Sequence, residues 1–279
     1  MQDIYQTDIE TSRDRYSLPV EVVENDTDLY WHIALAMYTA VEKNNAQGRP
    51  SIMIVPVGPV FQYRRFVRLC RFRPLDLSGL HLFFMDEYLD SEGRLISSRD
   101  PLSFRGFVDE ELIDAMPSQM GLERSQIVFP SPETVGEYDA RLAELGGADI
   151  CIAGVGINGH LAFNEPPEPG EEMSNEAFLA LPSRVISLTR ETITINSNTA
   201  LRGAFDRVPV QAVTVGFRQI FSAREVQVYL NRPWQSAVVR RMLLGTSEAR
   251  FPASLLQEHP DARITLTAEV ARRPRFALK

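Results

Sequence analysis

The sequence has few of the residues that crosslink chains, ligate metals or span membranes. It contains only two cysteines and four histidines in 279 residues, and no apolar run approaches the roughly 18 residues needed to cross a bilayer. Cys70 and Cys151 lie in apolar settings without a C-x-x-C pair or a preceding signal peptide, which favours a reduced, cytoplasmic protein without a disulfide. His259 has no neighbours that complete a metal-ligand set, and no metal site is expected.

The sequence also has fewer basic than acidic residues. The 29 basic residues are outnumbered by 37 acidic ones, so the net charge of −8 argues against nucleic-acid or anionic-membrane partners. The one basic run, Arg64 to Arg73, has apolar residues interleaved at helical spacing, and we interpret it as a solvated amphipathic helix rather than an anion-binding surface.

Alternating strand and helix patterns dominate the rest of the chain. Residues 1–18 are polar and predict an N-terminal arm, either frayed or used at an interface, followed by a single domain over 19–279. Strands rich in Val and Ile that alternate with helices indicate the α/β class, with a mostly parallel sheet covered on both faces. The expected strands are 51–56, 80–85, 127–130, 149–153, 184–189, 212–215, 226–230 and 263–267, and the expected helices are about 25–41, 61–72, 102–116, 133–145 and 234–244. Segments 90–100 and 167–182 look like loop insertions, either lids and interface elements or solvent loops.

The strongest candidate site is the segment G-V-G-I-N-G-H-L-A-F-N-E-P, residues 154–166. It directly follows a buried strand, so it should leave the carboxyl end of the sheet, where α/β proteins bind ligands. Its glycines allow a sharp turn, His160 can transfer protons, and Glu165 can orient or relay to the ring. The alternative is a glycine-rich turn around a structural histidine.

Two further candidates follow other strands. Asp86 and Glu87 end the strand at 80–85, and because extended residues alternate in direction, we expect Asp86 to face the crevice and Glu87 to pack elsewhere; a helix-capping role is the alternative. Gly58 supplies a turn after the strand at 51–56, but Pro59 has no N–H and its neighbours have no hydroxyl, so this turn is poorly equipped to bind phosphate.

The M-D-E-Y motif at 85–88, the loop at 154–166, V-P-V-Q-A-V-T-V-G and P-A-S-L-L-Q-E-H-P together resemble the glucosamine-6-phosphate deaminase family, whose relatives include the 6-phosphogluconolactonases. The resemblance extends from about Val20 to Thr267 and implies a doubly wound, three-layer α/β/α sandwich that acts on a small-molecule sugar without a metal or organic cofactor. The resemblance is compatible with a homo-oligomer of this chain.

The resemblance also implies roles for individual residues. His160 would open the sugar ring, Asp86 would move a proton between C2 and C1, and Glu165 would tune or relay to His160. The residues expected to contact the sugar are Gly58, Glu87, Gly156, Gly159, Ala162, Asn198 and Gln235.

The chain departs from the family pattern at four places. Many members have an aspartate where this chain has Asn158, whose amide can orient the imidazole but carries no charge. At the phosphate site, the turn around Gly58 lacks hydroxyls, an expected arginine is Asn198, and an expected lysine is Gln235. Losing two cationic partners costs roughly 3 to 6 kcal/mol, so we expect glucosamine-6-phosphate to be a poor substrate in the usual pose. A relocated phosphate or carboxylate site could instead use Arg64, Arg105, Arg218 or Arg232, and for Arg218 and Arg232 an ordinary surface position is the alternative.

The sequence therefore predicts an amino-sugar isomerase and deaminase whose substrate lacks the usual 6-phosphate or holds it differently. A lactonase-type sugar hydrolase and a non-catalytic sugar-binding or regulatory protein are the alternatives.

Overall fold

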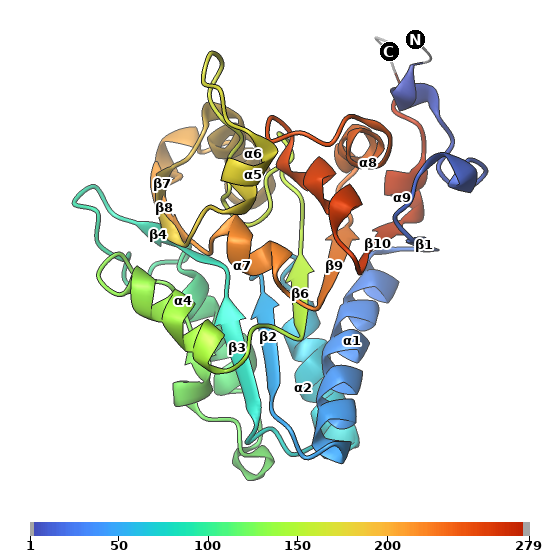
Figure 1. Cartoon of the computed structure of the whole chain (residues 1–279). Helices are drawn as coiled ribbons and strands as arrows, with labels where there is room; N and C mark the ends of the chain where they lie inside the picture. The colour runs from blue at the N-terminus through green and yellow to red at the C-terminus, as the bar shows by residue number, and fades with distance from the viewer. Residues whose placement is uncertain (1–2, 276–279) are drawn as a thin grey trace.

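The molecule is built around a seven-stranded parallel sheet with the strand order β1-β10-β9-β6-β2-β3-β5. Figure 1 shows the computed structural model, which describes residues 3–275; its long strands point in one direction, so their carboxyl ends share one edge. The strands are β1 (Val20–Val23), β2 (Ser51–Val55), β3 (Leu80–Phe84), β5 (Ile127–Val128), β6 (Ile150–Ala153), β9 (Glu225–Leu230) and β10 (Ala262–Thr267).

The central strands are apolar on both faces because helices cover both. Every residue of β2 and β6 is buried. Alternate residues of β2 enter two different cores: Met53 packs with α1 (Asp26–Ala46) and α2 (Gln62–Phe72), whereas Ile54 packs with residues of α4 (Val135–Glu144), α7 (Phe217–Phe221) and α8 (Gln235–Leu244). The prediction of a three-layer α/β/α sandwich is confirmed.

Helix α1 illustrates how local sequence defines an element. Asn25 caps its first turn by accepting a hydrogen bond of 3.1 Å from the backbone N–H of Asp28. Leu29, Ile33 and Met37 follow at helical spacing, and all are buried against the sheet.

A second, smaller sheet differs from the prediction of one mostly parallel sheet. The expected strands near 184–189 and 212–215 form as β7 (Arg184–Ser187) and β8 (Gln211–Thr214). They lie in a separate three-stranded sheet, in which β8 is the middle strand and pairs antiparallel with both β7 and β4 (Asp86–Leu89). Met85 joins the two sheets, since its N–H bonds to the carbonyl of Val55 and its own carbonyl accepts from the N–H of Val215. The M-D-E-Y motif therefore begins a strand rather than a helix cap.

Other differences are local. The helix expected over 102–116 is α3 (Phe104–Val108), continued by a π-helical turn at Asp109–Ile113. The segment 167–182 contains the short helix α5 (Asn175–Leu179), and α6 (Arg190–Leu201) and α9 (Ala268–Ala271) were not anticipated. Among residues 3–275, no helix combines the length and hydrophobicity needed to cross a lipid bilayer.

The described part of the N-terminal segment lies against the domain. Ile9 and Leu18 are buried in the main core, and the guanidinium of Arg240 donates a hydrogen bond of 2.9 Å to the carbonyl of Thr7. Residues 3–18 are thus docked on α8 of the same chain, not frayed.

Candidate functional site

A cavity of about 390 Å³ opens where the carboxyl ends of the central strands meet the small sheet. Segments after β2, β6 and β9 form one side, and β4, α3 and α6 contribute the other. The polar side chains that line it are Asp86, Tyr88, Ser103, His160, Asn196, Tyr229, Asn231, Arg232, Trp234 and Gln235. This position agrees with the expectation that ligands bind beyond the carboxyl ends of a parallel sheet.

Glycines let the loop after β6 hold His160 against the backbone. A Cβ atom at Gly156 would lie 2.0 Å from Cε1 of the imidazole, so only glycine fits without moving the ring. Gly159 has a φ of +90°, and a Cβ there would lie 2.6 Å from the ring of Phe251. Gly156 lines the cavity, whereas Gly159 does not line it and lies next to Phe251, so the placement of Gly159 as a sugar contact is corrected.

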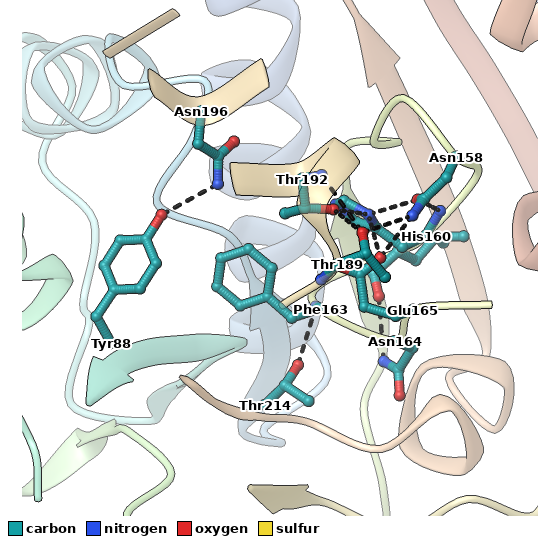
Figure 2. Close-up of polar contacts among 11 residues, drawn as sticks. Tyr88, Asn158, His160, Phe163, Asn164, Glu165, Thr189, Thr192, Asn196 and Thr214 are labelled. Carbon is teal, nitrogen blue, oxygen red and sulfur yellow. Dashed lines mark hydrogen bonds and ion pairs between the residues drawn. The ribbon is translucent and has the colours of Figure 1, made fainter. Parts of the chain in front are cut away.

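The Nδ1 atom of His160 lies among three oxygen atoms (Figure 2). Oδ1 of Asn158 is 2.8 Å away, Oε2 of Glu165 is 3.3 Å away, and Oγ1 of Thr192 is 3.3 Å away. Among the described residues none hydrogen-bonds to Nε2, and the ring lines the cavity. The Nε2 atom is therefore the imidazole nitrogen that remains available to a ligand.

The orientation of Asn158 assigns the tautomer of His160. Its amide nitrogen donates hydrogen bonds of 2.7 Å to Oε2 of Glu165 and 3.2 Å to Oγ1 of Thr189, so its amide oxygen must face the imidazole. An amide oxygen only accepts hydrogen bonds, so Nδ1 carries the proton. In the neutral ring, Nε2 then has a lone pair and can act as a base.

Glu165 provides the negative charge of this network. Burial alone would raise its pKa, but hydrogen bonds with His160, Thr192 and Asn158 and the charge of protonated His160 lower the pKa of Glu165 to about 2. A carboxylate thus lies beside the imidazole even though position 158 is an amide.

Asp86 faces the same cavity from the first residue of β4. Residues two apart on a strand share a face, and Asp86 and Tyr88 both line the cavity. Burial, together with the neighbouring charge of Glu87, raises the pKa of Asp86 to about 8. No described residue hydrogen-bonds to its carboxylate.

Glu87 points away from the cavity, as the alternation of β4 requires. Its carboxylate is fully buried and accepts hydrogen bonds from Oγ of Ser103 and from the backbone N–H groups of Tyr88, Phe104 and Arg105. It therefore anchors the first turn of α3 to β4. The placement of Glu87 as a sugar contact is corrected: it supports the wall and does not line the cavity.

Several lining or supporting residues were missed by the sequence analysis. Asn196 donates a hydrogen bond of 3.1 Å to the hydroxyl of Tyr88 across the cavity (Figure 2). Thr189 caps α6 and, with Thr192, contacts the network around His160. The T-x-x-T pattern at the start of α6 was a readable capping signal, but its proximity to His160 depends on the tertiary fold.

The positions expected to bind the sugar separate into two groups. Gly58, Ala162 and Gln235 line the cavity, and Ala162 has a left-handed φ of 52°. Asn198 is exposed on α6 outside the cavity, so its placement as a contact is corrected, since Asn196, two residues earlier on the helix, faces inward instead.

Of the four arginines considered as replacement anion ligands, one lines the cavity. Arg64 pairs with Glu111, and Arg218 lies 3.5 Å from Asp139. Arg105 donates a hydrogen bond of 2.7 Å to the carbonyl of Ile96. Arg232 borders the cavity at the turn between β9 and α8.

Within residues 3–275, no group of three or more His, Cys, Asp or Glu side chains is arranged to hold a metal ion.

Two known proteins with similar sequences are both glucosamine-6-phosphate deaminases. The chain is 30% identical over 220 residues to a glucosamine-6-phosphate deaminase of Colwellia psychrerythraea, covering 76% of this chain and 75% of that protein. It is 28% identical over 215 residues to the enzyme of the same name from Clostridium beijerinckii, covering 75% and 81%. No family model matches the chain.

Solved structures share the fold. A monomeric glucosamine-6-phosphate deaminase superposes with a TM-score of 0.77 at 23% identity, covering 91% of this chain and 99% of that one. A 6-phosphogluconolactonase from Thermotoga maritima gives a TM-score of 0.65 at 14% identity, covering 90% and 99%.

Proposed function

Because the chain belongs to the glucosamine-6-phosphate deaminase family, we propose that it isomerises and deaminates an amino sugar. The observation that carries the proposal is the shared cavity of Asp86 and His160, which come from different elements and differ in their chemistry. One is a carboxyl group whose pKa is raised to about 8, and the other is an imidazole with a free Nε2 atom. A proton transfer at carbon and a proton transfer at oxygen need two such groups.

Asp86 is assigned the transfer at carbon. Its carboxylate removes the proton from C2 of the open-chain amino aldehyde and returns a proton to C1. The product is a C2 imine with a C1 hydroxyl, and hydrolysis by one water molecule yields a ketose and ammonia. The apolar surroundings that raise the pKa of Asp86 make its carboxylate a stronger base than an exposed aspartate.

His160 is assigned the transfers at oxygen that open the sugar ring. With the proton on Nδ1 and a lone pair on Nε2, the ring accepts the proton of the C1 hydroxyl and donates it to the ring oxygen. The Glu165 carboxylate stabilises the imidazolium formed in between, over the 3.3 Å from its Oε2 atom to Nδ1.

We extend the proposal to the substrate and the setting. The turn around Gly58 presents Val57, Pro59 and Val60 to the cavity, and these residues supply no side-chain donor for a phosphate dianion. Glucosamine-6-phosphate is therefore expected to be a poor substrate in the usual pose. We also propose that residues 19–279 act as one catalytic domain and that the enzyme is cytoplasmic, which the two free, buried cysteines support.

The test is ammonia release from glucosamine, glucosamine-6-phosphate and related amino sugars by the wild-type protein and by Asp86→Asn. Asp76→Asn, which changes an aspartate outside the cavity, is the matched control. We expect the control to retain activity and Asp86→Asn to lose at least about a hundredfold, because a general base typically contributes 10² to 10⁴.

Each alternative has its own signature in this assay. Equal ammonia release by wild type and Asp86→Asn would show that Asp86 is not the proton acceptor. Acid release from a sugar lactone without ammonia from any amino sugar would indicate a lactonase. Sugar binding without either product would indicate a non-catalytic protein.

A further inference from the structure

Two hydrogen-bond donors on the turn between β9 and α8 have no acceptor. Arg232 is the only arginine or lysine that lines the cavity among residues 3–275, and no described residue forms a hydrogen bond or ion pair with its guanidinium. Trp234 lines the cavity on the same turn, and its buried indole N–H has no hydrogen-bond partner. The side chain of Arg232 is exposed, so its guanidinium is accessible to a ligand anion. The indole N–H of Trp234 is buried, and leaving a buried donor unpaired is unfavourable, so an acceptor atom of a ligand that reached it would satisfy it.

Gln235 holds this turn in place. Its Oε1 atom accepts hydrogen bonds of 2.9 Å from the backbone N–H groups of both Asn231 and Arg232. Its Nε2 atom donates a hydrogen bond of 2.8 Å to the carbonyl of Val155, after β6. The side chain is therefore engaged by the protein at both ends, and it is a positioning residue that ties the Arg232 turn to the loop that carries His160.

The other wall at this side of the cavity provides no competing cation. The turn after β2 contributes Val57, Pro59 and Val60, and a Cβ atom at Gly58 would meet no atom within 4 Å. This turn therefore offers space without charge, and within the described range 3–275 Arg232 is the one arginine or lysine side chain at the cavity that a ligand anion could contact.

We propose that Arg232, supported by the indole N–H of Trp234, is the specificity-determining residue for an oxyanion substituent on the amino sugar. The inference rests on the proposed function, because the reacting C1 and C2 must lie at Asp86 and His160, which leaves the rest of the sugar for Arg232. A carboxylate and a phosphate share this chemistry. One guanidinium balances one negative charge, so the carboxylate of an amino sugar acid suits the site better than a phosphate dianion.

The experiment compares three substrates that differ only at C6: glucosamine, glucosamine-6-phosphate and 2-amino-2-deoxyglucuronic acid. Values of kcat/KM are measured for wild type, Arg232→Ala, Arg232→Lys and Trp234→Phe, with Arg68→Ala as the control for loss of an exposed arginine outside the cavity. We expect Arg232→Ala to lower kcat/KM by about tenfold or more for an anionic substrate and to leave glucosamine unchanged, with partial retention in Arg232→Lys. The carboxylate and phosphate arms identify which oxyanion the site prefers.

An equal effect of Arg232→Ala on neutral and anionic sugars, or no effect, would overturn the inference. A binding arm separates this result from failure of the proposed function. Calorimetry with the two anionic sugars is performed on Asp86→Asn with and without Arg232→Ala. Binding that depends on Arg232 supports the inference even if no ammonia is ever released, and binding that is indifferent to Arg232 overturns it.

Discussion

The side-chain amide of Asn158 donates a hydrogen bond of 2.7 Å to the Oε2 atom of Glu165. The same amide presents its oxygen to Nδ1 of His160 at 2.8 Å, so one neutral residue bridges an anion and an imidazole. An aspartate at this position would place a second carboxylate at hydrogen-bond distance from Glu165. The neutral amide therefore hydrogen-bonds to both groups without adding charge, whereas an aspartate in its place would repel the carboxylate of Glu165 unless it were protonated.

Asn158→Asp is expected to destabilise the protein more at pH 8 than at pH 5. The pKa of Glu165 is about 2, so Glu165 is charged at both values, and the new aspartate must stay protonated to keep the hydrogen bond. Proton uptake becomes harder as the pH rises, and we expect a loss of about 1 to 3 kcal/mol at pH 8 and less at pH 5. Urea unfolding at the two pH values measures the difference. The exposed Asn198→Asp is the control, and equal losses at both pH values would contradict the shared-proton argument.

The rate of the reaction is expected to follow the ionisation of Asp86. Its pKa is raised to about 8, and the base must be charged, so the active fraction increases as the pH rises through this value. Below pH 8, kcat/KM should fall by about tenfold per pH unit on this limb, with a plateau above it. The measurement is a pH profile of kcat/KM between 6 and 9.5. A flat profile over this range would show that an ionised carboxylate at Asp86 does not limit the reaction.

Gly156→Ala is expected to abolish most activity while Gly154→Ala is tolerated. The added Cβ at 156 would lie 2.0 Å from the His160 ring, whereas at 154 the nearest atom would be the carbonyl oxygen of Tyr229 at 4.0 Å. Displacing the imidazole by an ångström costs about a hundredfold in rate. Both glycines line the cavity, so the pair is closely matched. Steady-state kinetics with both variants provide the test, and similar rates would argue against a precisely positioned His160.

Arg240→Met is expected to loosen the N-terminal segment. The buried guanidinium donates hydrogen bonds to the carbonyls of Thr7, Ser236 and Ala271, all of which the methionine would leave without this donor. We expect a loss of about 2 to 4 kcal/mol and early cleavage of residues 3–18. Chemical unfolding and limited proteolysis measure these effects. Arg99→Ala, at an exposed arginine, should change stability by less than about 0.5 kcal/mol, and equal stability of the two variants would contradict the role of Arg240.

Much of the parallel sheet was predictable because its signals are local. The apolar runs of β2 and β6 follow from burial on both faces, and Asn25 marks the beginning of α1 through its capping side chain. The antiparallel sheet was not predictable in the same way. Short strands such as β7 have ordinary strand composition, and the partner that a strand pairs with depends on the rest of the chain.

For the candidate site, the sequence by itself determined which chemical groups are present and how the loop can turn. Gly156, His160 and Glu165 were identifiable because glycine freedom, imidazole chemistry and carboxylate chemistry belong to the residues themselves. Only the tertiary structure decided which groups meet. It directed Glu87 into the wall and Asn198 to the surface, because side-chain direction depends on strand and helix phase. It also left Arg232 unpaired beside the cavity, since whether a cation finds a partner depends on contacts between distant segments.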